Sequence, residues 1–251
     1  MTGLRGQFTK FFTTKIYPKK PRYFRRMLKL AEFNPYWNQK LSKDFKFIKG
    51  INTNVHFRVA EFIEELHFIQ NLLSDDIPIT YLEFGVFQGN SILTASKIFN
   101  HTKSRFIGFD TFEGLPEPFD PANHPTGQFS THGKIPEIDD PRVFFIKGLF
   151  QNTLDEFMKN IDSLSMEKYS SELKNQQLVI NLDADLYSST LFCLTKLDSI
   201  ISKDTIIRFD EFSSLEDEWV ALRDYARSYY RDFEIIASSS DRWHTIIRIK
   251  K

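Results

Sequence analysis

Apolar and polar residues follow one another along most of the chain in a pattern that predicts strands and helices in turn. Short, nearly continuous apolar runs are typical of strands buried on both faces of a parallel sheet. Five such runs lie in the middle of the chain, at Ile79–Phe84, Arg105–Phe109, Val143–Ile146, Leu178–Leu182 and Thr205–Phe209. Helical stretches separate most of them, at Ser91–Phe99, Thr153–Leu164 and Ser188–Ile201. Strands that alternate with helices predict a parallel sheet covered on both faces.

The two ends of this region have different patterns. Apolar residues recur at helical spacing over Phe57–Leu73, so we expect a helix before the first strand. A further helix is expected around Leu215–Tyr230, followed by apolar runs at Phe233–Ala237 and Trp243–Ile249. A short polar turn joins these runs and predicts an antiparallel pair at the sheet edge. The chain is thus expected to form an α/β fold, with seven strands, an edge hairpin and helices on both faces.

Residues 1–50 show no clear periodicity and contain three prolines, so we expect an irregular arm with short helices, attached to a domain spanning 51–251. The whole chain has a net formal charge of zero, but residues 1–30 hold nine lysines and arginines and no acid. The remaining 24 basic and 33 acidic residues give the rest of the chain a net charge of −9. Such an arm suits contact with a membrane surface or an anionic glycan. Alternatively, it folds back onto the acidic body of its own or a second subunit, as in a homo-oligomer. We expect no nucleic-acid partner.

A long segment between the second and third predicted strands has no helical or strand pattern. Residues 114–141 hold six of the ten prolines, together with His124 and His132. Loops of this length inside a compact domain are usually functional. We therefore expect a lid over a site, with a rigid surface loop as the alternative.

Composition narrows the class of protein. A chain of 251 residues with 41% apolar and 26% charged residues is typical of a globular protein with one large domain and an appendage. The single cysteine, Cys193, forms no internal disulfide, and no apolar run approaches the ~18 residues of a membrane span. The first residues contain no apolar stretch typical of a signal peptide. We therefore expect a cytoplasmic protein.

The first candidate site follows the first two central strands. Glu83 precedes Gly85 and Gly89, which lead into the helix that begins at Ser91. Glycines allow a ligand to approach the backbone, and a helix N-terminus offers free N–H groups. The spacing differs from that of dinucleotide-binding motifs, and the acid suits a ligand that carries an ammonium, such as the methionine end of S-adenosylmethionine. Asp110 ends the second strand, where an acid can bind both hydroxyls of a ribose. A tight turn and a turn cap are the alternatives.

Four carboxylates follow the fourth and fifth of these strands. Asp183 and Asp185 stand on alternate residues, and Asp210 and Glu211 are adjacent. The carboxyl ends of parallel strands meet at one edge of the sheet, so we expect the four side chains to lie close together. Carboxylates that crowd together raise one another's pKa unless a positive charge compensates them. Oxygen ligands suit Mg²⁺ or Mn²⁺. These residues therefore predict a divalent cation site, with solvated strand ends as the alternative.

These segments resemble the macrocin O-methyltransferase family of class I, Rossmann-like sugar O-methyltransferases that depend on S-adenosylmethionine and Mg²⁺. The similarity runs from about Tyr81 to Tyr225 and includes four motifs: Glu-Phe-Gly-Val-Phe-Gln-Gly at 83–89, Phe-Asp-Thr-Phe-Glu-Gly-Leu-Pro at 109–116, Gly-Gln-Phe at 127–129 and Asp-Ala-Asp-Leu-Tyr at 183–187. Two departures concern the carboxylates. Ala184 stands where the family usually has glycine, and Glu211 stands where it usually has aspartate.

The resemblance implies a role for each candidate residue. The implied metal ligands are Asp183, Asp210 and Glu211, and the implied general base is Asp185. The implied cofactor contacts are Glu83, Gly85, Gly89, Ser91, Asp110 and Gly148. The implied reaction moves a methyl group from S-adenosylmethionine to a hydroxyl of a sugar, a glycan or a glycosylated small molecule, with Mg²⁺ or Mn²⁺ beside it. His124 or His132 in the loop is the alternative base.

Three other functions remain open on the sequence. Asp183-Ala184-Asp185 resembles the Asp-x-Asp motif of metal-dependent glycosyltransferases, which use nucleotide sugars. A catechol-type O-methyltransferase uses similar metal chemistry on a flat ring. A non-catalytic relative would bind the cofactor or a partner without turnover.

Overall fold

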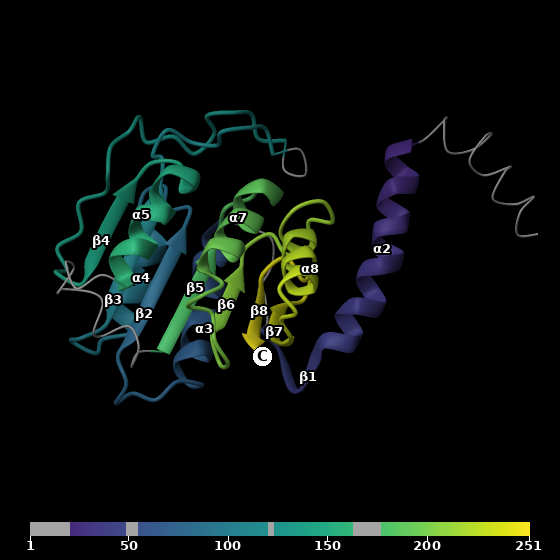
Figure 1. Ribbon diagram of the computed structural model, residues 1–251, viewed down its shortest axis with the longest axis horizontal. Coiled ribbons are helices and arrows are strands. Elements are labelled where there is room, and N and C mark those ends of the chain that lie inside the picture. Colours follow the sequence, from purple (N-terminus) through teal and green to yellow (C-terminus); the bar gives the residue numbers. More distant parts are fainter. Residues whose placement is uncertain (1–20, 49–54, 120–122, 163–176) are drawn as a thin grey trace, which may run out of the picture. The chain divides into compact units, whose positions relative to one another are not determined.

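The computed structural model describes residues 21–48, 55–119, 123–162 and 177–251 (Figure 1). Its contacts divide the chain into two compact units, Met1–Leu41 and Ser42–Lys251. The described part of the first unit is helix α2 (Pro21–Lys40). The second unit holds the sheet and its covering helices.

Helix α2 corrects part of the prediction for residues 1–50. Short helices are expected there because an internal proline costs a helix about 3 kcal/mol, yet α2 continues for 20 residues through Pro35. Phe33 and Trp37, four residues apart on one face, are buried with their ring centroids 5.6 Å apart. This pairing, which spans Pro35, helps to offset the cost of the proline. Residues 1–20, which carry much of the predicted basic arm, lie outside the described residues.

Eight strands form one sheet in the order β1-β7-β8-β6-β5-β2-β3-β4. Their bounds are β1 Leu41–Ile48, β2 Ile79–Phe84, β3 Arg105–Asp110, β4 Val143–Lys147, β5 Gln177–Leu182, β6 Ile206–Phe209, β7 Phe233–Ser239 and β8 Thr245–Ile249. Strands β2 to β6 pair in parallel, whereas β8 runs antiparallel to both β6 and β7. The mostly parallel α/β sheet and its antiparallel hairpin confirm the predicted fold class.

The predicted number of seven strands is wrong, because β1 forms an eighth at the sheet edge. Its sequence, Leu-Ser-Lys-Asp-Phe-Lys-Phe-Ile, lacks a continuous apolar run, and most of its side chains are exposed or half-buried. Charged residues are typical of edge strands, since they discourage pairing with a further chain. Because of these charges, the strand does not form an apolar run in the sequence and was not predicted.

Helices cover both faces of the sheet (Figure 1). Their bounds are α3 Val55–Gln70, α4 Asn90–Ile98, α5 Phe150–Asp162, α7 Tyr187–Leu197 and α8 Glu218–Ser228. Contacts join α3 to α4 on one face and join α5 to α7 and α7 to α8 on the other. All the residues of β2 and β6 are buried between these layers. Both faces of the sheet are covered, which explains why most residues of these strands are apolar.

The order in which strands are added to the sheet reverses at β2. From β2 the chain builds outward through β3 and β4, and it then returns to place β5 and β6 on the other side. Ligands of open parallel sheets bind beyond the carboxyl ends of the strands at such a switch point. We therefore expect a ligand site at the loops after β2, β3, β5 and β6.

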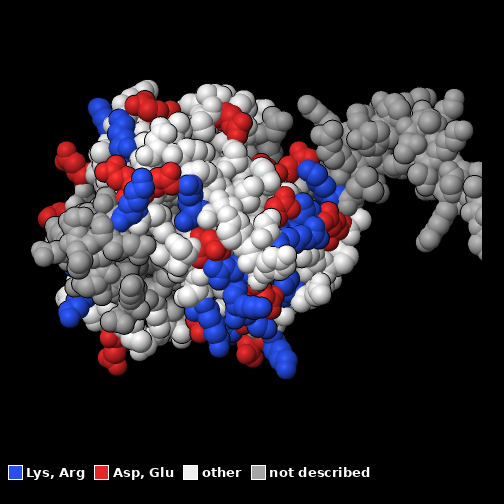
Figure 2. Space-filling view, viewed as in Figure 1, with Lys and Arg blue, Asp and Glu red and all other residues white. Residues whose placement is uncertain are grey.

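Figure 2 shows lysine and arginine side chains interspersed with aspartate and glutamate over the visible face of the described residues. Among the described residues, none of the helices combines the length and the apolar composition needed to cross a bilayer.

Candidate active site

The carboxyl ends of β2, β3, β5 and β6 surround one cavity of about 260 Å³. Six of the predicted site residues line it: Gly85, Asp110, Asp183, Asp185, Asp210 and Glu211. The other lining residues are Val86, Phe87, Thr111, Gly114, Leu115, Pro116, Phe129, Leu149, Phe150, Gln151, Ala184 and Ser189. Gly85 and Asp110, which are predicted to bind the cofactor, and the four predicted carboxylates thus share a single cavity.

The loop after β2 runs close to the end of β5. Gly85 has a φ of +89°, and a Cβ at this position would lie 1.8 Å from the carbonyl oxygen of Asp183. Only glycine fits both the backbone conformation and this close approach. Asp110 fixes the same loop, because its Oδ2 accepts the N–H groups of Val86 and Phe87, each at 2.8 Å. The loop is therefore held open toward the cavity by its glycine and by the acid at the end of β3.

Glu83, Gly89, Ser91 and Gly148 do not line the cavity. A Cβ on Gly89 would lie 3.0 Å from Pro136 of the long loop. The N–H of Gly148 donates to the carbonyl of Asp110 at 2.9 Å. The contact of these four residues with the cofactor stays a prediction.

Glu83 is a fully buried carboxyl with three side-chain donors. Ser91 Oγ donates to Oε1 at 2.7 Å, and Tyr81 Oη and Asn181 Nδ2 donate to Oε2 at 3.0 and 3.2 Å. Burial raises the pKa of Glu83 from 4.5 to about 7 although these donors oppose the shift. The carboxyl joins β2, β5 and the first turn of α4 beneath the glycine loop.

This raised pKa predicts a pH dependence of stability. A carboxyl with a higher pKa in the folded than in the unfolded protein stabilises the fold below the unfolded pKa, and this contribution is lost as pH rises through the folded pKa. Between pH 5.5 and 8 wild type should therefore lose about 2 kcal/mol of unfolding free energy relative to Glu83→Gln. Urea unfolding of both proteins at the two pH values measures this difference, and any packing cost of the amide cancels. Parallel pH curves for the two proteins would show that Glu83 titrates normally.

Three carboxylates at the floor of the cavity lie close enough to bind one ion. Asp183, Asp210 and Glu211 each offer an oxygen, and these oxygens lie within 4.8 Å of one another. Burial, followed by the charge of Asp210, raises the pKa of Asp183 and of Glu211 well above the ordinary values. Burial also disfavours ionised Asp210, but the charges of Arg208 and His244, together with hydrogen bonds from Arg208 and Glu211, outweigh this effect and lower its pKa. The group is thus a cluster of crowded oxygens that is short of positive charge.

Asp185 lies beside this cluster but is not part of it. Its side chain lines the cavity and is only 7% exposed, and burial raises its pKa to about 7. Its backbone has a φ of +58°, which is unusual for a residue other than glycine. Such strain is often concentrated at functional sites, where the surrounding structure maintains it.

The long loop closes one side of the cavity. Gly114, Leu115 and Phe129 line it, and the Phe129 ring packs against Phe87 of the glycine loop with centroids 5.8 Å apart. His124 packs on the outer side of Phe129, with centroids 4.9 Å apart.

Neither of the two loop histidines that were considered as alternative bases lines the cavity. His132 is exposed to solvent. Residues 120–122 of this loop lie outside the described residues.

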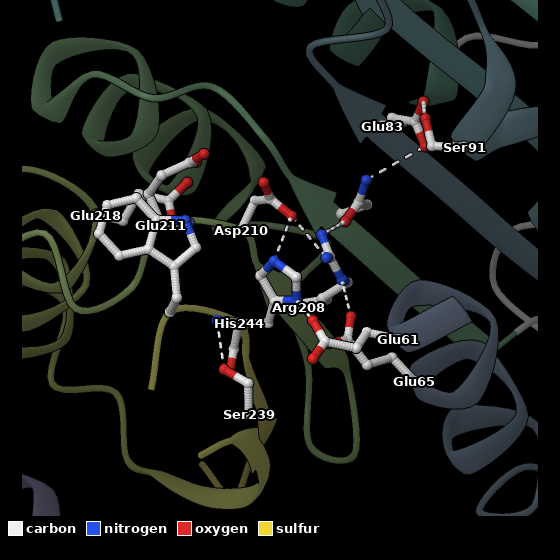
Figure 3. A network of polar contacts seen from close by, with 12 residues as sticks. Glu61, Glu65, Glu83, Ser91, Arg208, Asp210, Glu211, Glu218, Ser239 and His244 are labelled. Atoms are coloured by element: carbon white, nitrogen blue, oxygen red, sulfur yellow. Dashed lines mark hydrogen bonds and ion pairs between the residues drawn. The ribbon is translucent and has the colours of Figure 1, made fainter. Parts of the chain in front are cut away.

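Three buried charged residues near the cavity were not predicted from the sequence. Arg208, Glu65 and His244 come from β6, α3 and the turn before β8, and all three contact Asp210 or one another (Figure 3). A charged residue within the otherwise apolar strand Ile206–Phe209 was the one signal in the sequence that could have revealed the set.

The sheet order, the glycine loop and a cavity at the carboxyl ends of the central strands define a class I methyltransferase. A family model described as macrocin-O-methyltransferase (TylF) matches residues 58–236. The chain belongs to this family and is an S-adenosylmethionine-dependent O-methyltransferase, which confirms the resemblance seen in the sequence. The family match favours methyl transfer over the glycosyltransferase hypothesis.

Solved structures show the same fold. The calicheamicin methyltransferase CalS11 is 17% identical with a TM-score of 0.56, and the alignment covers 97% of this chain and 90% of CalS11. The O-methyltransferase NovP is 16% identical with a TM-score of 0.54, and the alignment covers 77% of this chain and 80% of NovP. A search of curated proteins gives no match.

Proposed function

We propose that this enzyme methylates a hydroxyl of a sugar or glycosylated small molecule and that it requires a divalent cation, Mg²⁺ or Mn²⁺. The observation that carries the proposal is the convergence of Asp183, Asp210 and Glu211, whose oxygens lie within 4.8 Å of one another. They share a cavity with Gly85 and Asp110, the residues expected at the cofactor.

The donor set fits a hard divalent cation. All three side chains offer oxygen, which Mg²⁺ and Mn²⁺ prefer. Glu211 Oε2 is buried and has no hydrogen-bond partner among the described residues, an arrangement that costs free energy unless something binds there. The extra methylene of Glu211, relative to the aspartate usual in the family, does not take its oxygen out of the group. A divalent cation held by these carboxylates would supply Lewis-acid polarisation of adjacent acceptor hydroxyls.

The protein residues then divide the remaining work. Asp185 lies in the same cavity and accepts the proton of the reacting hydroxyl, because its pKa near 7 suits a general base at neutral pH. The glycine loop and Asp110 would hold the cofactor, and Leu149 and Phe150 offer apolar side chains in the same cavity, where they would contact its adenine. Phe129 and Leu115 of the long loop line the same cavity, so we infer that this loop is the predicted lid. Holding donor and acceptor in contact supplies much of the rate enhancement without covalent chemistry.

The proposal that the acceptor is a sugar rests on two observations. The relatives include a structure titled TDP-rhamnose 3'-O-methyltransferase, which has a TM-score of 0.51 to this chain. The carboxylates form a polar end of the cavity that suits the neighbouring hydroxyls of a sugar. A catechol also presents two adjacent hydroxyls, so it is the acceptor that has to be tested against sugars.

Calorimetry and a methyl-transfer assay test the proposal. We expect S-adenosylmethionine to bind in calorimetry, and a nucleotide sugar without a free acceptor hydroxyl not to react in the methyl-transfer assay. Methylation of a deoxysugar glycoside should stop when EDTA removes divalent cations and should resume when Mg²⁺ is added. Undiminished transfer in EDTA would remove the metal from the proposal. Faster methylation of a catechol than of any sugar would replace the acceptor class.

Three further predictions accompany this function. They are a cytoplasmic location, contact of the basic arm with a membrane or an anionic glycan, and a homo-oligomeric state. The arm belongs largely to residues outside the described part of the chain.

A further inference from the structure

Arg208 is a buried charge within an apolar strand. It is 2% exposed, whereas the other residues of β6 are Ile206, Ile207 and Phe209. A guanidinium removed from water is costly unless it is paired and hydrogen-bonded. Arg208 does not line the cavity, yet it lies two residues before Asp210. The partners of the guanidinium must therefore compensate the cost of burying its charge.

Each nitrogen of the guanidinium is bound by a different element. Nε donates to Oε2 of Glu65 on α3 at 2.5 Å, and Nη1 donates to Oδ1 of Asn181 on β5 at 2.9 Å. Nη2 donates to Oδ1 of Asp210, just after β6, at 2.6 Å. The plane of the group lies near the ring of Phe62, with 4.7 Å between Cζ and the ring centroid. Three hydrogen bonds and a ring thus hold the guanidinium in one orientation, and Figure 3 shows the contacts with Glu65 and Asp210.

His244 contacts the same two carboxylates, those of Glu65 and Asp210. Its Nδ1 lies 2.9 Å from Glu65 Oε1, and its Nε2 lies 3.6 Å from Asp210 Oδ1. Glu65 is thereby joined to both Arg208 and His244. Both of the contacts to Asp210 are made to Oδ1, so they fix the plane of this carboxylate without occupying Oδ2.

We propose that Arg208 is a positioning residue, which holds the Asp210 carboxylate in the orientation that binds the divalent cation. It acts through Asp210, because its guanidinium is bound within the protein core rather than at the cavity. Glu65 and Asn181 act one step further away, since they fix the guanidinium itself. The inference rests on the proposed metal dependence.

Arg208→Lys tests the proposal while keeping the positive charge. A lysine ammonium is a single point charge and does not reproduce the planar fork that reaches Glu65, Asn181 and Asp210 together. Loss of groups that orient metal ligands typically weakens metal binding about 10–100-fold. We expect Mn²⁺ titration by calorimetry to show a loss of this size in R208K. S-adenosylmethionine affinity in metal-free protein should be unchanged, which distinguishes positioning of Asp210 from general damage to the fold.

Arg142→Lys is the matched control. The Arg142 guanidinium also forms a fork with a carboxylate, Asp140, donates to the carbonyls of Ser96 and Phe99, and lies 5.2 Å from the ring centroid of Phe106. It precedes β4 and therefore lies at the opposite end of the parallel sheet from Asp210. Both variants should lose stability, but only R208K should lose Mn²⁺ affinity.

A second variant covers the case in which R208K does not fold. Glu65→Gln keeps an oxygen for Arg208 but removes the charge that anchors it, so we expect weaker Mn²⁺ binding than in wild type and stronger binding than in R208K. Wild-type Mn²⁺ affinity in folded R208K, or in E65Q if R208K is unfolded, would overturn the positioning role of Arg208 and leave the proposed metal dependence in place. Equal losses in R208K and R142K would also overturn it. A wild-type protein that binds no divalent cation would instead overturn the proposed metal dependence, and the inference with it.

Discussion

Asp185→Asn is expected to reduce methyl transfer at least 100-fold, while the affinity for S-adenosylmethionine stays at the wild-type level. A positioned general base typically contributes about 10²–10⁴ in rate, and an amide cannot accept the proton of the acceptor hydroxyl. Asp185 lines the cavity, but it belongs to the loop after β5 and not to the glycine loop after β2, which is expected to hold the cofactor. The assay is the initial rate with saturating cofactor, with cofactor binding measured by calorimetry.

Asp198→Asn is the matched control for this prediction. Asp198 is a partly buried carboxylate that accepts hydrogen bonds from Tyr225 and Arg231, 2.7 Å away in each case, and it does not line the cavity. Its loss should lower stability and leave the rate per folded molecule intact. If D185N kept more than a tenth of wild-type turnover, another group would have to be the base.

The central fold was predictable because burial on both faces leaves a clear mark on a strand. Strands β2 and β6 read as apolar runs, since helices cover both sides of them. Strand β1 was not predicted because an edge strand keeps its charged residues in solvent, and the length of α2 was not predicted because its internal proline suggested a break. Both errors occur where solvent or a single residue, rather than the periodic pattern, decides the local structure.

The carboxylates of the site were predictable for a related reason. Asp183 and Asp185 directly follow a buried strand, so the direction of the sheet alone brings them to the edge where Asp210 and Glu211 also lie. The Arg208 contacts were not predictable, because Glu65 lies 143 residues away along the chain and the pairing exists only once α3 packs on the sheet. A single charged residue in an apolar run indicates that some partner exists, but not which one.

Asp183→Asn should weaken Mn²⁺ binding by more than the about 10–100-fold expected when an orienting group is lost, and methyl transfer should fall with it. Asp183 offers one of the three clustered oxygens, and an amide carries no charge to attract the cation. Its side chain, unlike its backbone carbonyl, is not what approaches Gly85, so the glycine loop should stay in place. Calorimetric titration with Mn²⁺ and a rate measured against Mg²⁺ concentration would show the loss.

Glu218→Gln provides the comparison that separates ligation from mere burial of an acid. Glu218 is fully buried beside the cluster, and its Oε2 accepts the N–H of Glu211 at 2.8 Å. Burial, and then the charge of Asp210, raises its pKa well above the ordinary value, but its oxygens are not among the three that lie within 4.8 Å of one another. E218Q should therefore bind Mn²⁺ nearly as wild type does. If E218Q and D183N lost affinity to the same extent, the cation would depend on the charge of the whole acidic region and not on three particular oxygens.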